Sequence, residues 1–182
     1  MTSYCVYVRD HPEDEYNRLY HDREYGFPLK KDNFLFERFV LEINQAGLSW
    51  ITILKKKENF FRAYVGFDIN RIAKYGNRDI NRLLQDSGII RNKLKINAAL
   101  ENARRIIALY DEFGSFKGWL DAHHPRPLDD WAKLFKTNFV FTGREIVREF
   151  LVSTGYLAGA HEVKCPIYKT VAALHPAWMR KE

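Results

Sequence analysis

Two cysteines and two histidines are the side chains of this sequence best suited to holding a metal ion. Cys5 and His21 lie near the start of the chain, and His161 and Cys165 lie near its end with three residues between them. Two thiolates and two imidazoles complete a tetrahedral zinc shell, which leaves no open position for a substrate. The four residues therefore predict a structural zinc site that joins the N- and C-terminal segments.

A second interpretation of these residues needs no metal. A free cysteine is commonly a small buried hydrophobic residue, and a lone histidine is commonly an ordinary core or surface group. The alternating residues 4–8 around Cys5 are typical of extended backbone, and the distance to His21 fits no standard zinc-finger spacing. The second pair is the stronger signal, because Pro166 suits a helix start and would hold Cys165 at its entrance.

The elements that must position such a site are predicted to be helices. Residues that favour helix N-termini are repeatedly followed by glycines that favour helix C-termini. The predicted segments are 10–26, 32–47, 49–66, 68–76, 77–88, 92–114 and 143–155. Strand signals are nearly absent, so the expected fold class is all-α, a compact helical bundle with short connections.

Length and composition favour one soluble globular domain. The chain has 182 residues, of which 46% are hydrophobic, so a sizeable core is expected and disorder is not. The loop at residues 123–127 is the best candidate for a subdivision, near residues 115–130. No apolar run is long enough to cross a bilayer, no signal-peptide core is evident, and two distant cysteines suggest no disulfide framework. We therefore expect a cytoplasmic protein.

The charge balance favours a polyanionic partner. The formal net charge is +6, and the basic residues form local clusters at 55–57 and 91–95. Each cluster could equally be a solvated helix face. Just before the second cluster, Gly88 could take a positive φ, and Asn92 could cap the helix that follows. The exposed amides of that helix N-terminus would then lie beside Arg91, Lys93 and Lys95. The sequence thus predicts a phosphate-binding site at this hairpin, although an ordinary αα-hairpin is the commoner explanation.

Glu42 is the acidic residue whose position most favours a function. At 100° per residue it projects on nearly the same helix face as Leu35 and Phe39, which belong to the apolar stripe. Burying a carboxylate costs several kcal/mol unless partners offset the loss, so such a residue is usually paired or functional. The loop that follows exposes Leu48 and leads to Trp50, an aromatic plate in the next helix.

Four motifs together resemble the DNA-3-methyladenine glycosylase I family of the helix-hairpin-helix superfamily. The motifs are the run from Gln45 to Asn59, the triplet Tyr20-His21-Asp22, the hairpin from Asp86 to Arg91, and the segment from His161 to Cys165. The resemblance covers nearly the whole chain, and all four zinc positions of that family are occupied in order. It therefore implies an all-α domain over residues 1–182, a helix-hairpin-helix motif and a structural zinc ion.

The resemblance also implies a reaction and its residues. Enzymes of this family flip an N3-alkylated adenine out of double-stranded DNA and hydrolyse its bond to deoxyribose, without metal in the reaction. Glu42 would accept from the exocyclic amine and favour the cationic base, Tyr20 would bond another edge, and Trp50 would stack on the ring. Leu48, at the tip of the loop with Gly47, would fill the gap in the duplex. The hairpin with Gly88, Arg91, Lys93 and Lys95 would hold the backbone.

Several positions depart from the family pattern. Two pocket tryptophans appear as Tyr7 and Tyr25, the small residue after the pocket glutamate is Ile43, and Arg144 and Glu145 stand where small hydroxylated residues are expected. These differences predict a pocket with smaller aromatic faces, extra charge and a shifted range of lesions. No lysine marks a Schiff-base lyase, so a monofunctional reaction is expected.

Three functions remain open at this point. The first is a monomeric repair glycosylase whose partner is duplex DNA containing alkylated bases. The second is a module that binds damaged or distorted DNA without cleaving it, which the altered pocket would suit. The third is a zinc hydrolase, which would have to give up one of its four ligands for water.

Overall fold

The structure is a computed structural model that describes residues 3–180, and those residues form helices and no strand. The α-helices are α1 (Tyr4–Asp10), α2 (Glu15–Arg23), α3 (Asp32–Gln45), α4 (Trp50–Ala63), α5 (Ile69–Ala73), α6 (Asn77–Gln85), α7 (Lys93–Ala108), α8 (Tyr110–Phe113), α9 (Phe116–His123), α10 (Leu128–Asn138), α11 (Arg144–Ser153) and α12 (Pro166–Ala172). Two short 3-10 helices, Val65–Phe67 and Ala177–Met179, complete the set. None of the helices described combines the length and the apolar character needed to cross a bilayer. The predicted all-α fold class is confirmed.

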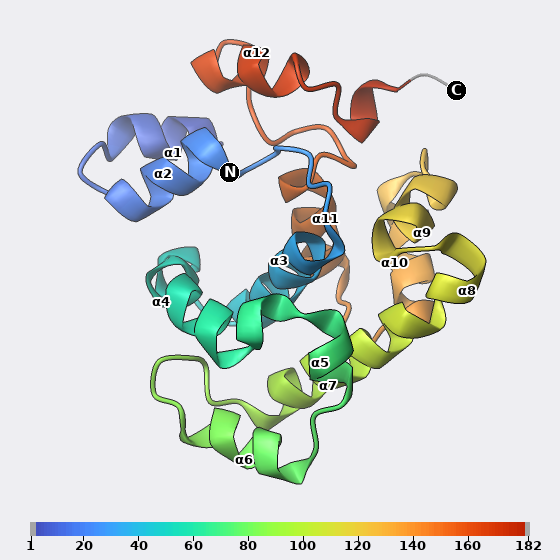
Figure 1. Cartoon of the computed structure of the whole chain (residues 1–182). Helices are drawn as coiled ribbons and strands as arrows, with labels where there is room; N and C mark the ends of the chain where they lie inside the picture. The colour runs from blue at the N-terminus through green and yellow to red at the C-terminus, as the bar shows by residue number, and fades with distance from the viewer. Residues whose placement is uncertain (1–2, 181–182) are drawn as a thin grey trace.

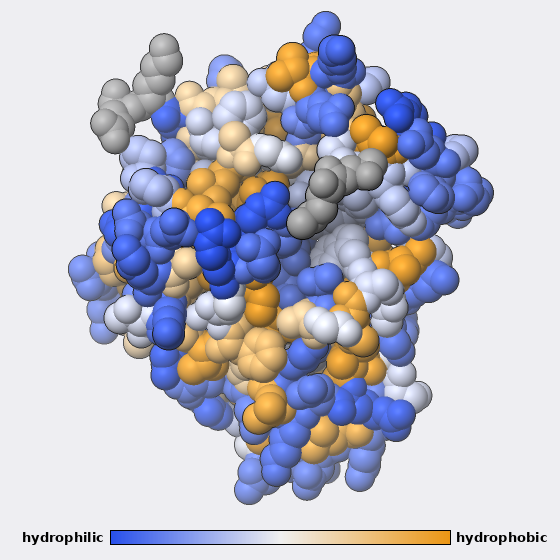
Figure 2. All heavy atoms as spheres, turned by 180° about the vertical axis from the view of Figure 1, so that it is seen from behind, coloured by the Kyte–Doolittle hydropathy of each residue, from blue (hydrophilic) through white to orange (hydrophobic). Residues whose placement is uncertain are grey.

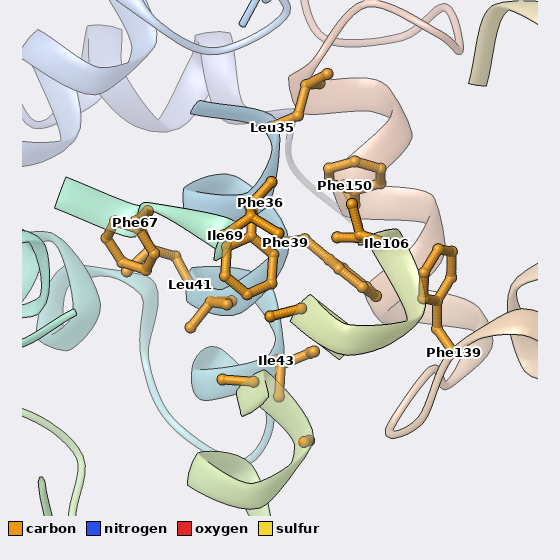
Figure 3. Packing of buried hydrophobic residues seen from close by; sticks show 14 of the residues in the cluster. Leu35, Phe36, Phe39, Leu41, Ile43, Phe67, Ile69, Ile106, Phe139 and Phe150 are labelled. Carbon is orange, nitrogen blue, oxygen red and sulfur yellow. The ribbon is translucent and has the colours of Figure 1, made fainter. Parts of the chain in front are cut away.

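Helix α3 is the centre of the molecule. It makes contacts with α4, α7, α9 and α11 (Figure 1), so most of its circumference is covered by protein. Apart from the exposed Phe34 in its first turn, its apolar side chains are fully buried, and Phe39 lies among the rings of Phe139 and Phe150 (Figure 3). A helix buried on nearly all sides is held firmly by dispersion and hydrophobic contacts. Side chains at its C-terminal end, including Glu42, therefore start from a rigid base.

The first residue of α3 also fixes the helices on its far side. The Asp32 carboxylate accepts from the backbone N–H groups of Phe116 and Lys117, at 2.7 and 2.9 Å, and so caps the N-terminus of α9. Trp119 of α9 and Trp131 of α10 are buried in the same core cluster as α3. One continuous core thus runs past the residue 123–127 loop, which forms the connection between these two helices.

The N- and C-terminal segments of the chain come together at the Cys5, His21, His161 and Cys165 side chains. Figure 1 shows α1, α2 and α12 gathered at one end of the molecule and α6 at the opposite end. The prediction that residues 4–8 are extended is wrong, because they belong to α1. The Ser3 side chain accepts from the N–H of Val6 and starts this helix, and Val8 is its buried contact with the rest of the protein.

Capping residues account for several of the predicted helix starts. Asp68 and Asn92 each accept from backbone N–H groups of the first turn, and Ser49 is the N-cap of α4. The predicted helix start at Asp10 is wrong, because Asp10 ends α1 and the next helix begins at Glu15 with Asp14 as its N-cap. Helices α9 and α10 were not predicted, since their starts at Ser115 and Pro127 lie in a segment rich in loop residues. The surface carries hydrophobic residues in separate patches among hydrophilic ones on the face shown in Figure 2.

Candidate functional site

The four predicted metal ligands lie together. Their ligand atoms are all within 4.8 Å of one another, although the residues come from α1, α2, the loop after α11 and the N-cap of α12. His21 Nε2 lies 3.3 Å from Cys5 Sγ and 3.2 Å from His161 Nδ1, and Cys165 Sγ is 3.8 Å from both ring nitrogens. Tetrahedral bonds of the usual zinc lengths would place such atoms about 3.3 to 3.8 Å apart. The arrangement therefore fits one ion held by all four residues.

The outer atoms of both histidines are also held. His21 Nδ1 lies 2.8 Å from a carboxylate oxygen of Asp22, and His161 Nε2 lies 2.7 Å from the carbonyl oxygen of Tyr25. Such partners orient the rings and leave the opposite nitrogens facing the centre of the cluster, as outer partners do at metal sites. Because Tyr25 also lines the neighbouring pocket, the cluster and the pocket share a wall.

A pocket of about 600 Å³ lies next to the cluster and collects the predicted base-binding residues. Its lining includes Tyr7, Tyr20, Tyr25, Glu42 and Trp50, together with Glu149, which the sequence did not indicate. The tyrosines come from α1, α2 and the turn after α2, whereas Glu42 comes from the end of α3. A single nucleobase fits within this volume, and aromatic faces with one carboxylate are suited to hold it.

Glu42 is buried without a partner. Its side chain is 4% exposed, and no hydrogen bond or ion pair to its carboxylate occurs among residues 3–180. Burial raises the pKa of Glu42 to about 8, which the nearby Arg38 opposes and Glu149 reinforces. A carboxylate in this state lacks the hydrogen bonds that normally offset burial, so a cationic group with donors would stabilise it.

Tyr20 and Trp50 lie beside Glu42, and the indole N–H of Trp50 has no hydrogen-bond acceptor among residues 3–180. The rings of Tyr20 and Trp50 meet edge to face with centroids 5.1 Å apart. The indole Nε1 of Trp50 is buried, and residues 3–180 supply it with no hydrogen-bond partner. Trp50, which was predicted to stack on the base, thus lines the pocket from the first turn of α4.

Of the positions that depart from the family pattern, some line the pocket and others lie away from it. Tyr7 and Tyr25 line it, as predicted. Ile43 is fully buried in the core (Figure 3), so it does not alter the pocket. The expectation of extra charge from Arg144 and Glu145 is wrong, because both are exposed and Arg144 pairs with Asp129 at 2.8 Å.

The extra charge comes instead from the next turn of α11. Arg148 and Glu149 line the pocket, pair with each other, and Glu149 accepts from the Tyr25 hydroxyl at 3.2 Å. Sequence reasoning missed both, since only the orientation of α11 shows which of its turns faces the pocket. Arg38 was also missed, although its spacing of four residues from Glu42 was a usable signal.

The loop after α3 presents the predicted wedge. Gly47 has a φ of +80°, a conformation that glycine adopts without strain, and Leu48 is 38% exposed at the tip. Lys95 reaches this loop from α7 and donates to the carbonyls of Asn44 and Ala46, at 2.7 and 2.6 Å. The prediction that Lys95 contacts phosphate is therefore wrong, because its buried ammonium caps the end of α3.

The α6–α7 hairpin differs from its predicted form in two further ways. Gly88 does not have a positive φ, but a β-carbon there would lie 2.9 Å from an Asp86 oxygen and 3.1 Å from Asn59, so the position requires space. The Asn92 side chain already accepts from the amides of Leu94 and Lys95, which are therefore not free. Arg91 and Lys93 are exposed, as a contact with phosphate requires.

Replacing Lys95 by methionine should destabilise the protein and loosen the wedge loop. Two carbonyls would lose their donor, so we expect the free energy of unfolding in urea to fall by about 2 kcal/mol. Lys93→Met is the matched control on the exposed side of the same turn, and it should leave stability unchanged. Equal stability of K95M and the wild type would show that the Lys95 ammonium does not hold the end of α3.

Comparisons with known proteins place the chain among enzymes of one kind. Residues 10–133 match the family described as methyladenine glycosylase. The DNA-3-methyladenine glycosylase of Haemophilus influenzae is 34% identical, over 91% of this chain and 98% of that protein. The DNA-3-methyladenine glycosylase 1 of Escherichia coli is 36% identical, over 82% of this chain and 89% of that protein.

Solved structures give the same result. A crystal structure of 3-methyladenine DNA glycosylase I has a TM-score of 0.76 and 35% identity, covering 85% of this chain and 94% of that one. The Staphylococcus aureus enzyme, whose structure was described as the basis of 3-methyladenine recognition, has a TM-score of 0.76 and 29% identity. It covers 85% of this chain and 92% of that one.

Proposed function

Because the chain belongs to the methyladenine glycosylase family and is a DNA glycosylase for alkylated adenine, we propose that its lesion pocket is the cavity around Glu42. The observation that carries this proposal is a carboxylate that is 4% exposed, has no partner among residues 3–180 and lines a cavity large enough for a purine. Alkylation at N3 gives adenine a positive charge, and the exocyclic amine of the base carries hydrogens to donate. An unpartnered carboxylate lacks both a positive charge beside it and a hydrogen-bond donor.

The reaction requires little acid catalysis from the protein. A cationic base is already a good leaving group, so its bond to deoxyribose breaks while the sugar becomes oxocarbenium-like. Glu42 would accept from the exocyclic amine, and its negative charge would hold the base as the bond lengthens. Trp50 would offer its ring face to the flipped base, and the Tyr20 hydroxyl would bond a second position. A water molecule completes the hydrolysis, so the reaction is monofunctional.

A base-release assay tests this function against the binding-only alternative. The protein is incubated with duplex DNA treated with a methylating agent, and the supernatant is analysed for free bases by chromatography. A glycosylase releases 3-methyladenine in a time-dependent way, and untreated DNA gives none. A damage-binding module would retard the methylated duplex in a gel without releasing any base, and that result would overturn the proposal.

We also propose that the Cys/His cluster holds a structural zinc ion. The distances between ligand atoms suit tetrahedral coordination, and two thiolates with two imidazoles are a common zinc donor set. Cys5, His21, His161 and Cys165 would all bind the ion, so none would be left for a catalytic water. This argues against a zinc hydrolase and leaves the chemistry to the pocket.

Duplex DNA is the proposed form of the substrate, with the α6–α7 hairpin acting as a helix-hairpin-helix motif. Arg91 and Lys93 are exposed there, and Leu48 projects from a separate loop. We propose a single glycosylase domain that acts as a monomer. Its location in the cytoplasm remains a prediction from the sequence.

Replacing Leu48 by alanine should slow base release from duplex DNA about tenfold. A leucine that fills the gap left by the flipped nucleotide offsets part of the unstacking energy, and single-stranded DNA has no such gap. Release from methylated single strands should therefore be unchanged, as should the melting temperature, because Leu48 is exposed. Leu174→Ala, at an exposed leucine just after α12, is the matched control. Equal losses on both DNA forms would remove Leu48 from the wedge role.

A further inference from the structure

The tyrosine hydroxyls of the pocket differ in where their hydrogens go. Three of the four donate to acceptors within the protein. These acceptors are Asn17 Oδ1 for Tyr4 at 2.7 Å, Asp14 Oδ2 for Tyr7 at 3.0 Å and Glu149 Oε2 for Tyr25 at 3.2 Å. A hydroxyl has a single hydrogen, so these three can only accept from a ligand in the pocket.

Tyr20 has the opposite arrangement. Its hydroxyl oxygen lies 2.7 Å from Nη1 of Arg38, and a guanidinium carries donors and no acceptor. The Tyr20 oxygen must therefore accept this bond, which leaves its own hydrogen for another partner. No acceptor for that hydrogen occurs among the hydrogen bonds of residues 3–180, and the side chain lines the pocket with Glu42.

Arg38 is locked in this position. It is 4% exposed, it also donates to Glu24 at 3.2 Å and to the Ser153 carbonyl at 3.4 Å, and its guanidinium lies 4.7 Å from the centroid of the Tyr20 ring. An arginine stays charged in proteins, so it cannot become an acceptor. The direction of the hydrogen bond to Tyr20 is thus fixed whenever the network is intact.

We propose that Arg38 is a positioning residue that makes Tyr20 a hydrogen-bond donor to the lesion base, so that Tyr20 and Glu42 form a donor–acceptor pair selective for alkylated adenine over alkylated guanine. The inference rests on the proposed function of the pocket. It adds a residue outside the pocket lining and states which partner atoms the base must offer.

The selectivity follows from the two purines. Adenine has an amino group at C6, and the ring nitrogens on either side of it, N1 and N7, carry lone pairs. A donor and an acceptor side by side on the protein match this edge. Glu42 is assigned to the C6 substituent, and guanine bound in the same position would present its C6 oxygen to that carboxylate, which places two acceptors against each other. Sites that hydrogen-bond a substrate group reject analogues that lack it far better than apolar sites do.

The test is a double-mutant cycle on Arg38 and Tyr20. Wild type, Arg38→Met, Tyr20→Phe and the double variant are assayed for release of 3-methyladenine and 3-methylguanine from methylated duplex DNA, with thermal unfolding measured for each. Where Tyr20 is kept, R38M should lower 3-methyladenine release and its preference over 3-methylguanine, each about tenfold. In the Y20F background no hydroxyl remains to be oriented, so R38M should leave the preference unchanged. Release of 3-methyladenine should still fall in part, because Arg38 also favours the ionised form of Glu42.

Arg38→Lys separates orientation from general damage. An ammonium also carries donors and no acceptor, so R38K should regain most of the preference for adenine, even if R38M folds poorly. Equal losses of the preference in both backgrounds would show that Arg38 acts through folding or charge alone and would overturn the inference, as would an unchanged preference in R38M. If the wild type releases no 3-methyladenine, the proposed function itself fails and the inference fails with it.

Discussion

Glu42→Gln should lose base release from methylated DNA by about 1,000-fold while gaining stability in alkaline solution. The amide keeps the shape of the side chain but supplies no negative charge to the cationic base. It also removes the ionisation that burial opposes. The two effects have opposite signs and one origin, the unpartnered carboxylate on the last turn of α3. A residue that opposes folding and is required for activity is typical of a functional site.

The stability gain depends on pH in a defined direction. The pKa of Glu42 is raised by burial to about 8 in the folded protein, above its ordinary value in the unfolded chain. The stabilising effect of the neutral form is thus complete below about pH 4 and is lost as pH rises towards 8. The free energy of unfolding should therefore fall with pH in the wild type relative to E42Q, by about 4 kcal/mol between pH 5 and pH 8.5.

Urea unfolding at several pH values measures this difference. Glu58→Gln, on the exposed side of α4, is the control for the loss of one carboxylate and should show a constant difference. The same pKa predicts that kcat/KM for 3-methyladenine release rises with pH up to about 8, because the free enzyme must ionise Glu42 before it can hold a cation. Full activity in E42Q, or stability curves that stay parallel, would remove this carboxylate from the mechanism.

Removal of the proposed zinc ion should both unfold the terminal segments and abolish activity. Helix α1 has seven residues and only Val8 buried, so its position depends on Cys5 and on the other ligands. The same segments carry Tyr7, Tyr20 and Tyr25 to the pocket wall. Structural zinc commonly contributes on the order of 10 kcal/mol to small zinc domains, and we expect a loss of at least about 5 kcal/mol here.

Metal analysis, circular dichroism and base release during chelation measure the effect. We expect one zinc ion per chain, a lower melting temperature after chelation, and recovery of helix content and activity when zinc is restored. Cys5→Ser should behave like the chelated protein, whereas His11→Ala, which changes a histidine of the same region outside the cluster, should keep its zinc. A stable but inactive metal-free protein would point to a catalytic ion, and an unchanged one to a cluster that needs no metal.

The sequence predicts local features of this protein better than contacts across it. Helix starts at Ser49, Asp68 and Asn92 follow from capping chemistry that involves only neighbouring residues. The extended prediction for residues 4–8 failed because a seven-residue helix with one buried side chain has no clear helical periodicity. The cluster of Cys/His residues was predictable because few residue types can bind zinc.

The interaction partners of individual charged side chains were not predictable from the sequence alone. Lys56 and Lys95 belong to basic clusters that suggested contacts with phosphate, but both donate to backbone carbonyls, Lys56 to that of Ser87 at 2.9 Å. Whether a lysine faces solvent or a helix end is decided by which helices pack together. The same holds for Arg38 and Glu149, whose partners lie far from them along the chain.

The residues that line the pocket stand either on a buried helix or on a partly exposed one, and this difference affects how the substrate range can change. Glu42 stands on a helix that is almost wholly enclosed, so changes around it disturb the interior. Arg148 and Glu149 stand on a partly exposed turn of α11, where new side chains meet mainly water and the cavity. Exchanges on that turn can therefore retune which damaged bases are accepted while the core keeps its packing, and a library restricted to these two positions is the economical route to new substrate preferences.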